Sequence, residues 1–192
     1  MGAGVNMAQG LERTNDGSIN FAFVGDSTFF ASAITGVVNA VYNQSNMVLI
    51  VLDNSTTAMT GNQPHPGTGV TMMGDVVEKI AIEPILTAIG VKSVQTVNPL
   101  DLETSMKAVK LAASTKGVSA IIFKAPCIAV AKPKPAFEVH QDACIQCKEC
   151  ITQIGCPAIV LKDGLVEIEK SLCYGCGLCS QVCDIKAIVR GE

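Results

Sequence analysis

The sequence predicts an α/β domain with a mostly parallel sheet, followed by a small second domain that is rich in cysteine. Three observations lead to this prediction. Strand-length apolar runs alternate with helical patterns up to about residue 125, a Lys-Pro-Lys-Pro stretch follows, and eight of the nine cysteines lie after that stretch. Continuous Val, Ile and Leu runs that alternate with helices are typical of a parallel sheet with helices on both faces, which makes three layers.

The elements of the first domain are expected in a regular order. Residues 1–11 have the pattern of a glycine-rich helix start with no strand before it, so we expect the domain to be truncated at its N-terminus. Strands are expected at 19–24, 47–52, 93–97 and 118–123, and helices at 28–42, 75–89 and 101–113. Pro84 is expected to kink or split the helix at 75–89.

A pair of prolines indicates where the first domain ends. Proline cannot continue a helix and it stiffens a connector, so the stretch around Lys132-Pro133-Lys134-Pro135 is interpreted as an extended linker. The predicted division is a first domain at 1–125, a linker at 126–137 and a cysteine-rich domain at 138–192.

Composition narrows the class of protein. The chain has 192 residues, of which 48% are hydrophobic and 16% charged, as in a well-packed globular protein. A net charge of −3 gives no reason to expect nucleic acid or an anionic membrane as a partner. There is no secretion signal, and the longest apolar runs are too short to span a membrane, so we expect a cytoplasmic protein.

The cysteines form an internal repeat. Two segments match, CIQCKECITQIGC from Cys144 and CYGCGLCSQVC from Cys173, each with a triplet of cysteines and a fourth further on. This spacing is typical of two-cluster ferredoxins, where the fourth cysteine ligates the other half's cluster. The predicted [4Fe–4S] ligands are Cys144, Cys147, Cys150 and Cys183 for one cluster, and Cys173, Cys176, Cys179 and Cys156 for the other. Zinc is the alternative, but a zinc knuckle uses two cysteine pairs, not two triplets.

The repeat departs from the ferredoxin pattern in two places. Five residues separate Cys150 from Cys156, and Asp184 stands where a proline usually follows the last ligand. Cys127 lies outside both triplets and is interpreted as a small buried residue at a strand end. His140 is interpreted as structural.

Polar side chains follow two strands of the first domain. Gly25-Asp26-Ser27 ends one strand and opens a helix, and Asp53-Asn54 closes the next strand. Ligands of α/β sheets bind at the carboxyl ends of strands. A carboxylate and an amide oxygen suit Mg²⁺, and a helix start can donate N–H groups to a diphosphate. The pattern therefore favours a Mg²⁺–diphosphate site.

The segments GDSTFFASAI, LDNSTTAMTGNQ and PHPGTG resemble the thiamine diphosphate motif of the 2-oxoacid:ferredoxin oxidoreductases, especially the indolepyruvate branch. In that family a thiamine-binding domain precedes a small α+β ferredoxin domain with two [4Fe–4S] clusters. The resemblance implies Mg²⁺ ligands at Asp26, Asn54 and the Thr56 carbonyl, and cofactor contacts at Gly25, Ser27, Thr28, Thr60, Gly61 and Gln63. It also implies a substrate-facing catalytic role for His65, while Asn62 stands where histidine is often found.

The implied reaction is the oxidative decarboxylation of an aryl pyruvate to its acyl-coenzyme A, with ferredoxin as the electron acceptor. The partners are the 2-oxo acid, coenzyme A, ferredoxin, and a pyrimidine-binding domain or a second subunit. Three alternatives stay open: a pyruvate-type oxidoreductase, a non-oxidative thiamine decarboxylase, and a ferredoxin-like electron carrier that is not an enzyme.

Overall fold

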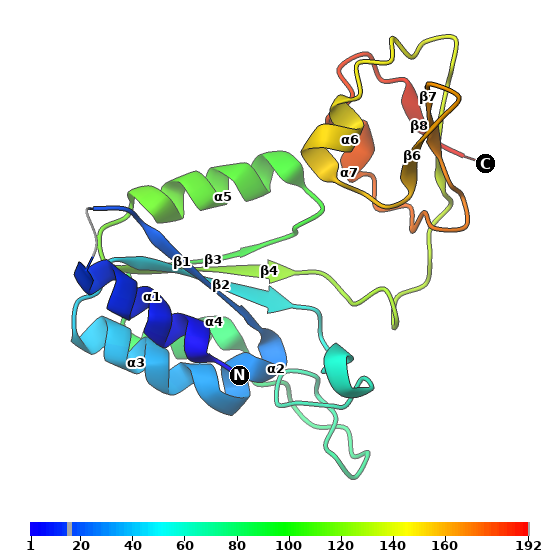
Figure 1. The fold of residues 1–192 in the computed structure, drawn as a ribbon. Helices are drawn as coiled ribbons and strands as arrows, with labels where there is room; N and C mark the ends of the chain where they lie inside the picture. The colour runs from blue at the N-terminus through cyan, green and yellow to red at the C-terminus, as the bar shows by residue number, and fades with distance from the viewer. Residues whose placement is uncertain (15–16, 192) are drawn as a thin grey trace. The chain divides into compact units, whose positions relative to one another are not determined.

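The chain consists of two compact units, Met1–Ala129 and Val130–Glu192. Residues 1–14 and 17–191 are described here from a computed structural model (Figure 1). The division between the units falls inside the stretch 126–137 that the sequence predicts as a linker.

The first unit is built on a four-stranded parallel sheet. Its strands lie in the order β1-β2-β4-β3. Their bounds are β1 Asn20–Gly25, β2 Met47–Asp53, β3 Ser93–Val97 and β4 Val118–Lys124. The two central strands, β2 and β4, are buried over their first five residues and mostly apolar there, as expected for strands with both faces covered. The predicted α/β class and the four predicted strands are confirmed.

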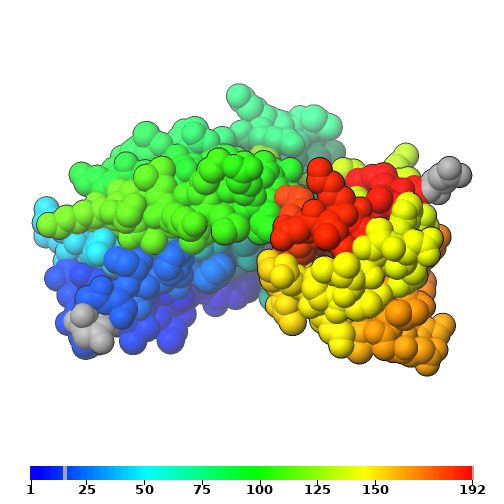
Figure 2. Space-filling model, turned by 90° about the horizontal axis from the view of Figure 1, so that it is seen from above, coloured from blue at the N-terminus to red at the C-terminus, as the bar shows by residue number. Residues whose placement is uncertain are grey.

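The two faces of this sheet are covered unequally (Figure 1). Helices α1 (Ala3–Thr14), α3 (Ile34–Tyr42) and α4 (Ile82–Ile89) pack on one face, where the larger core includes Phe29, Leu49 and Leu86. Only α5 (Leu102–Ser114) covers the opposite face, around Ile50 and Ile121. The view onto the α5 side shows N-terminal residues (blue) beside the green residues around α5 (Figure 2).

One helical segment leads from the first strand back across the sheet. It begins with α2 (Asp26–Thr28), continues as a π-helix at Phe29–Ala33, and ends as α3. The sequence predicts this helix at 28–42, and the structure starts it two residues earlier. The helix therefore begins directly at Asp26, where its first backbone N–H groups are free to bond outside the helix.

The helix predicted at 75–89 is wrong in its first half. The observed helix α4 starts only at Ile82, so Pro84 is its third residue. Proline is tolerated in the first turn because the N–H groups there have no partner within the helix. Residues 75–81 instead form part of a loop, in which Val76 pairs with Val70 and the Ile80 N–H donates to the Pro66 carbonyl.

Helix α5 is capped as its sequence suggests. It starts after Asp101, which accepts hydrogen bonds from the Thr104 N–H at 3.1 Å and from the Thr104 hydroxyl at 2.7 Å. These two bonds lower the pKa of Asp101, the hydroxyl contributing most. The predicted start at residue 101 is therefore the N-cap itself.

The second unit is a small α+β fold of two antiparallel strand pairs and two short helices. Strand β5 (Phe137–Val139) pairs with β8 (Ile188–Arg190), and β6 (Ile159–Lys162) pairs with β7 (Leu165–Ile168). The helices are α6 (Glu149–Ile154) and α7 (Leu178–Gln181). Pairing of the unit's first strand with its last closes the fold on itself.

Candidate functional site

The two polar segments singled out in the first domain meet at one edge of the sheet. Strands β1 and β2 are adjacent and parallel, with Gly25 opposite Leu52. Asp26 therefore follows β1 at the same edge where Asp53 and Asn54 follow β2. The short 3-10 helix Ala58–Thr60 continues from there.

Asp26 is the centre of this edge. It is buried, with 2% of its surface exposed. Its Oδ1 accepts a hydrogen bond from the Ser27 N–H at 2.8 Å, and its Oδ2 accepts one from the Ser55 N–H at 2.8 Å. Burial raises the pKa of Asp26, because desolvation outweighs the lowering effect of these N–H groups. A buried carboxylate of this kind is suited to a cation that removes its unfavourable charge.

The turn that carries Asn54 wraps against Asp26. The Asn54 Oδ1 accepts a hydrogen bond from the Thr56 N–H at 3.1 Å, and Thr56 is itself buried. Asp53 accepts from the Ser55 N–H and forms an ion pair with Lys124 at 3.2 Å. The structure thus brings Asp26 beside the turn 54–56. The predicted ligands Asn54 and Thr56 lie in that turn.

The other predicted cofactor residues divide between this edge and a separate loop. Gly25 and Ser27 flank Asp26, whereas the Thr28 hydroxyl lies 3.7 Å from the Met1 sulfur. The remaining three, Thr60, Gly61 and Gln63, form a closed turn in which Thr60 Oγ1 donates to Gln63 Oε1 at 2.7 Å and Gln63 Nε2 donates back to the Thr60 carbonyl. Gly61 has a φ of 114°, which favours glycine.

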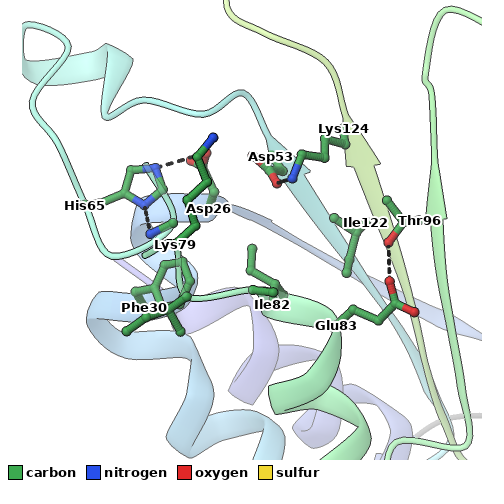
Figure 3. Close-up of a pocket in the computed structure, with 13 residues that line it drawn as sticks. Asp26, Phe30, Asp53, His65, Lys79, Ile82, Glu83, Thr96, Ile122 and Lys124 are labelled. Carbon is green, nitrogen blue, oxygen red and sulfur yellow. Dashed lines mark hydrogen bonds and ion pairs between the residues drawn. The ribbon is translucent and has the colours of Figure 1, made fainter. Parts of the chain in front are cut away.

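His65 faces Asp26 (Figure 3). Its Nε2 lies 3.2 Å from Asp26 Oδ2, and its side chain is only 6% exposed. Its Nδ1 accepts a hydrogen bond from the Gly67 N–H at 3.2 Å. The contact with Asp26 is within ion-pair distance, but Nε2 is not aligned for a hydrogen bond and has no hydrogen-bond partner among the described residues. The histidine predicted to face a substrate is therefore in contact with the predicted cation ligand.

A cavity of about 230 Å³ opens beside Asp26 and His65. It is also lined by two lysines, Lys79 and Lys124, which sequence reasoning missed. Lys124 is the last residue of β4, which lies next to β2 in the sheet, so a correct strand order would have placed it near Asp53. Lys79 lies in the segment 75–81, which the sequence predicts as helix and the structure shows as loop. Hard oxygen donors, a buried carboxylate with a raised pKa, an unpartnered buried imidazole nitrogen and two cationic side chains fit a Mg²⁺-bound diphosphate.

Cys127 and His140 lie outside the predicted sites. Cys127 is partly buried on the segment after β4, and its N–H donates to the Asn54 carbonyl at 3.0 Å. Its backbone thus braces the turn beside Asp26. His140 is largely exposed, with Nε2 3.9 Å from a Glu138 oxygen.

In the second unit the cysteine repeat is also a backbone repeat. Gln146 and Lys148 of the first triplet have φ values of 58° and 63°, and the matching Gly175 and Gly177 have 68° and 82°. Glycine adopts this left-handed region readily, whereas glutamine and lysine adopt it only against a steric cost. The same left-handed conformation at matched positions, despite its cost in the first loop, indicates that the loop shape serves the cysteines.

Thiols of the two halves of the repeat influence one another electrostatically. Burial raises the pKa of Cys179 to about 11, with further contributions from Cys176, Cys173 and Cys156. Burial likewise raises the pKa of Cys150, whose neighbouring thiols are Cys147, Cys183 and Cys144. In each set the fourth thiol comes from the other half of the repeat.

These thiol sets do not form a site for a single ion. Within residues 1–14 and 17–191, no three His, Cys, Asp or Glu side chains converge closely enough to hold one metal ion. A cubane keeps its four thiolates farther apart than zinc does, because iron and sulfide ions lie between them. In addition, the Phe137 N–H donates to Cys173 Sγ at 3.4 Å. The thiol sets fit two [4Fe–4S] clusters.

Within the described part of the chain, no helix combines the length and apolar character needed to cross a membrane.

Comparison with known proteins places the first unit in a class. Residues 1–123 match the family described as thiamine pyrophosphate enzyme, C-terminal TPP binding domain. Thiamine pyrophosphate is another name for thiamine diphosphate, and the match covers well over half of the chain. The chain belongs to this family.

The particular relatives confirm the resemblance seen in the motifs. Indolepyruvate oxidoreductase subunit IorA of Methanothermobacter marburgensis is 41% identical over 191 residues, and the same subunit of Archaeoglobus fulgidus is 38% identical over 195 residues. Each alignment covers 98% of this chain and 31% of the relative, so the chain spans about a third of the length of these relatives. An uncharacterised ferredoxin of Methanocaldococcus jannaschii is 43% identical over 47 residues, which are 23% of this chain and 31% of that protein.

Proposed function

We propose that this chain is the cofactor-binding and electron-exit part of a thiamine-diphosphate-dependent 2-oxoacid:ferredoxin oxidoreductase. The observation that carries the proposal is the combination of two sites in one chain. A buried carboxylate, Asp26, meets the turn 54–56 at the carboxyl edge of a parallel sheet, and two crossed sets of four thiols follow in the second unit. An electron carrier has no use for the first site, and a non-oxidative decarboxylase has none for the second.

The chain's residues have distinct tasks in this proposal. Asp26, the Asn54 side chain and the Thr56 carbonyl hold Mg²⁺, and the N–H groups at the start of α2 face the diphosphate. Thiamine diphosphate, when bound, supplies the carbanion nucleophile and the electron sink for decarboxylation. Lys79 and Lys124 line the same cavity and offset negative charge there. Each set of four cysteines holds one [4Fe–4S] cluster, which accepts one electron at a time.

The overall reaction proposed for the complete enzyme is balanced in atoms and electrons. A 2-oxo acid and coenzyme A give an acyl-coenzyme A thioester, CO₂, two protons and two electrons, which two oxidised ferredoxins accept. We take indolepyruvate as the 2-oxo acid because the similar archaeal proteins are subunits of indolepyruvate oxidoreductase. The pyruvate-type enzyme is the second candidate, with the same chemistry in a smaller pocket.

Calorimetry tests the cofactor site. Thiamine diphosphate with Mg²⁺ should bind to the full chain, and Asp26→Ala should weaken binding strongly without unfolding the sheet, because the side chain lies at a strand end. Asp75→Ala, which removes an exposed carboxylate from the loop of the same unit, is the matched control. Equal affinities of Asp26→Ala and Asp75→Ala would refute the site.

Turnover tests the reaction and the substrate. The complete complex should reduce a viologen dye with indolepyruvate and coenzyme A, and indolepyruvate should outcompete pyruvate. If pyruvate is preferred, the pyruvate-type alternative is correct. The isolated chain should not turn over, because thiamine catalysis also needs a carboxylate from a pyrimidine-binding domain or partner subunit. Robust dye reduction by the isolated chain would contradict this part of the proposal.

A further inference from the structure

The two oxygens of the Asp26 carboxylate have unequal surroundings. Oδ1 accepts one hydrogen bond, from the Ser27 N–H. Oδ2 accepts one from the Ser55 N–H and also has His65 Nε2 at 3.2 Å. An ionised carboxylate oxygen offers two lone pairs, so Oδ2 has a second one left for the N–H of the nearby His65.

The His65 ring can only donate toward Asp26. Its Nδ1 already accepts from the Gly67 N–H, so the neutral ring carries its proton on Nε2. A protonated Nε2 cannot ligate a metal ion. This N–H is buried and lacks a hydrogen bond, which is costly, so a small rotation that aligns it with Oδ2 is favoured.

The ring has close neighbours at Phe30 and Gly67. Phe30, on the π-helix, lies with its ring centroid 5.7 Å from that of His65. A Cβ added at Gly67 would come within 3.0 Å of Phe30 Cε2 and 3.1 Å of His65 Cε1. Gly67 therefore has two effects on His65. Its N–H fixes the tautomer of the imidazole, and its lack of a side chain leaves room for the ring.

We propose that His65 is a positioning residue that selects the cation by occupying Oδ2 and leaving Oδ1 as the single oxygen of Asp26 open to it. The inference rests on the proposed function, because the cation is the one that anchors the diphosphate. Mg²⁺ demands near-octahedral geometry, which a carboxylate contact through one oxygen satisfies. Ca²⁺ accepts both oxygens of a carboxylate in a larger, flexible shell. Blocking Oδ2 therefore favours Mg²⁺ over Ca²⁺.

The position of the proton on the His65 ring can be measured without any cofactor. Nitrogen–proton correlation spectra of the full chain contain two histidines, His65 and the exposed His140, which provides an internal reference. His65 should show a proton on Nε2 and none on Nδ1, and Gly67→Ala should disturb this signal. Gly10→Ala, where an added Cβ meets nothing within 4 Å, is the matched control. A His65 ring with its proton on Nδ1 overturns the proposal.

Cation selectivity provides the second test. Thiamine diphosphate is titrated into the full chain with Mg²⁺ or with Ca²⁺. His65→Leu frees Oδ2, so it should weaken Mg²⁺-dependent binding about tenfold and Ca²⁺-dependent binding much less, because Ca²⁺ accepts both carboxylate oxygens. His65→Gln, which retains an N–H of similar reach, should restore the preference, and His140→Gln should leave it unchanged.

The outcomes separate the two proposals. Equal losses with both cations in His65→Leu, with a normal melting curve, overturn the selectivity role and leave the cofactor site standing. Failure of the unaltered chain to bind thiamine diphosphate with either cation overturns the proposed function and this inference together.

Discussion

The two units of this chain place their functional groups in opposite relations to their cores. In the first unit an apolar core fills the space between sheet and helices, and Asp26 sits at its edge. In the second unit the thiols of Cys150 and Cys179 are themselves among the buried residues, with 7% and 8% exposed. The first site is therefore an addition to a fold that apolar packing stabilises, whereas the second site is part of the interior that holds its fold together.

Removing iron should have the largest effect, and it should affect the second unit alone. Without clusters, the second unit has to bury protonated thiols around empty space, so its strands should lose most of their protection against hydrogen exchange. Amides of β2 and β4 in the same sample should keep theirs. Hydrogen exchange with and without a chelator measures both units at once.

Cysteine variants provide the controls for that experiment. The loaded chain should contain about eight irons, two cubanes of four. Cys183→Ala should damage the cluster of the first triplet rather than that of its own, because its thiol neighbours Cys150. Cys127→Ala, outside both sets, should change neither iron content nor protection. Persistent protection of β6 and β7 in the iron-free chain would show that the thiols are not essential to this core.

A substitution in the apolar core should affect the first unit alone. Leu49 is fully buried in β2, so Leu49→Ala should lower the free energy of unfolding of the first unit by about 2–5 kcal/mol. Leu52→Ala, at a largely exposed position of the same strand, should cost much less. The iron content and the protection of the second unit should not change in either variant. Coupled losses in both units would refute their independence.

The pH dependence of stability should show that ionised Asp26 destabilises the first unit. Its pKa in the folded state is raised above 3.8, so the folded state binds the proton more tightly than the unfolded state does. Its contribution to stability is full below pH 3.8 and is lost as the pH rises through the folded pKa. In Asp26→Asn this loss should vanish, as measured by urea unfolding over pH 3 to 8 without cations.

Asp101 is the internal comparison for this titration. Its pKa is lowered by Thr104, so its contribution is present above pH 3.8 and is lost as the pH falls through the folded pKa. Asp101→Asn should therefore remove a pH dependence of the opposite sign. Identical pH profiles for the two variants would contradict both assignments.

The smallest expected effect concerns the two halves of the cysteine repeat. Lys148 occupies the left-handed conformation that glycine occupies at Gly177. Lys148→Gly should therefore stabilise the iron-loaded second unit by about 1 kcal/mol, since glycine meets no steric cost there. Adding a side chain at the matched position, Gly177→Ala, should destabilise the unit. A loss of stability in Lys148→Gly would mean that the lysine side chain contributes more than its backbone costs.

The central strands β2 and β4 could be predicted because each is a short, mostly apolar run between polar turns. The crossed cysteine sets stay a prediction that rests on the repeat in the sequence. The start of α4 could not be predicted in the same way. Residues 75–81 continue a helical pattern of apolar positions, yet Ile80 is bound to Pro66 in a loop. This competing contact depends on how the loop folds, which local periodicity does not contain.

The candidate site was only partly predictable for the same reason. Asp26 and Asn54 each follow a strand, so the parallel sheet brings their segments together. The orientation of His65 toward Asp26 depends on Gly67 and Phe30, which local sequence does not connect to either residue. The lysines in the cavity likewise come from a neighbouring strand and a distant loop, and only the folded chain places them there.

The π-helix at Phe29–Ala33 changes the direction in which side chains point along one continuous helix. Each residue of a regular helix turns the side chains by about 100°, so one added residue within a turn resets the direction in which every later side chain points. Upstream, the helix must aim Asp26 at the sheet edge; downstream, it must aim Val37 and Ala40 into the core. Deleting one residue from the segment would restore a regular helix and leave only one of these two directions correct.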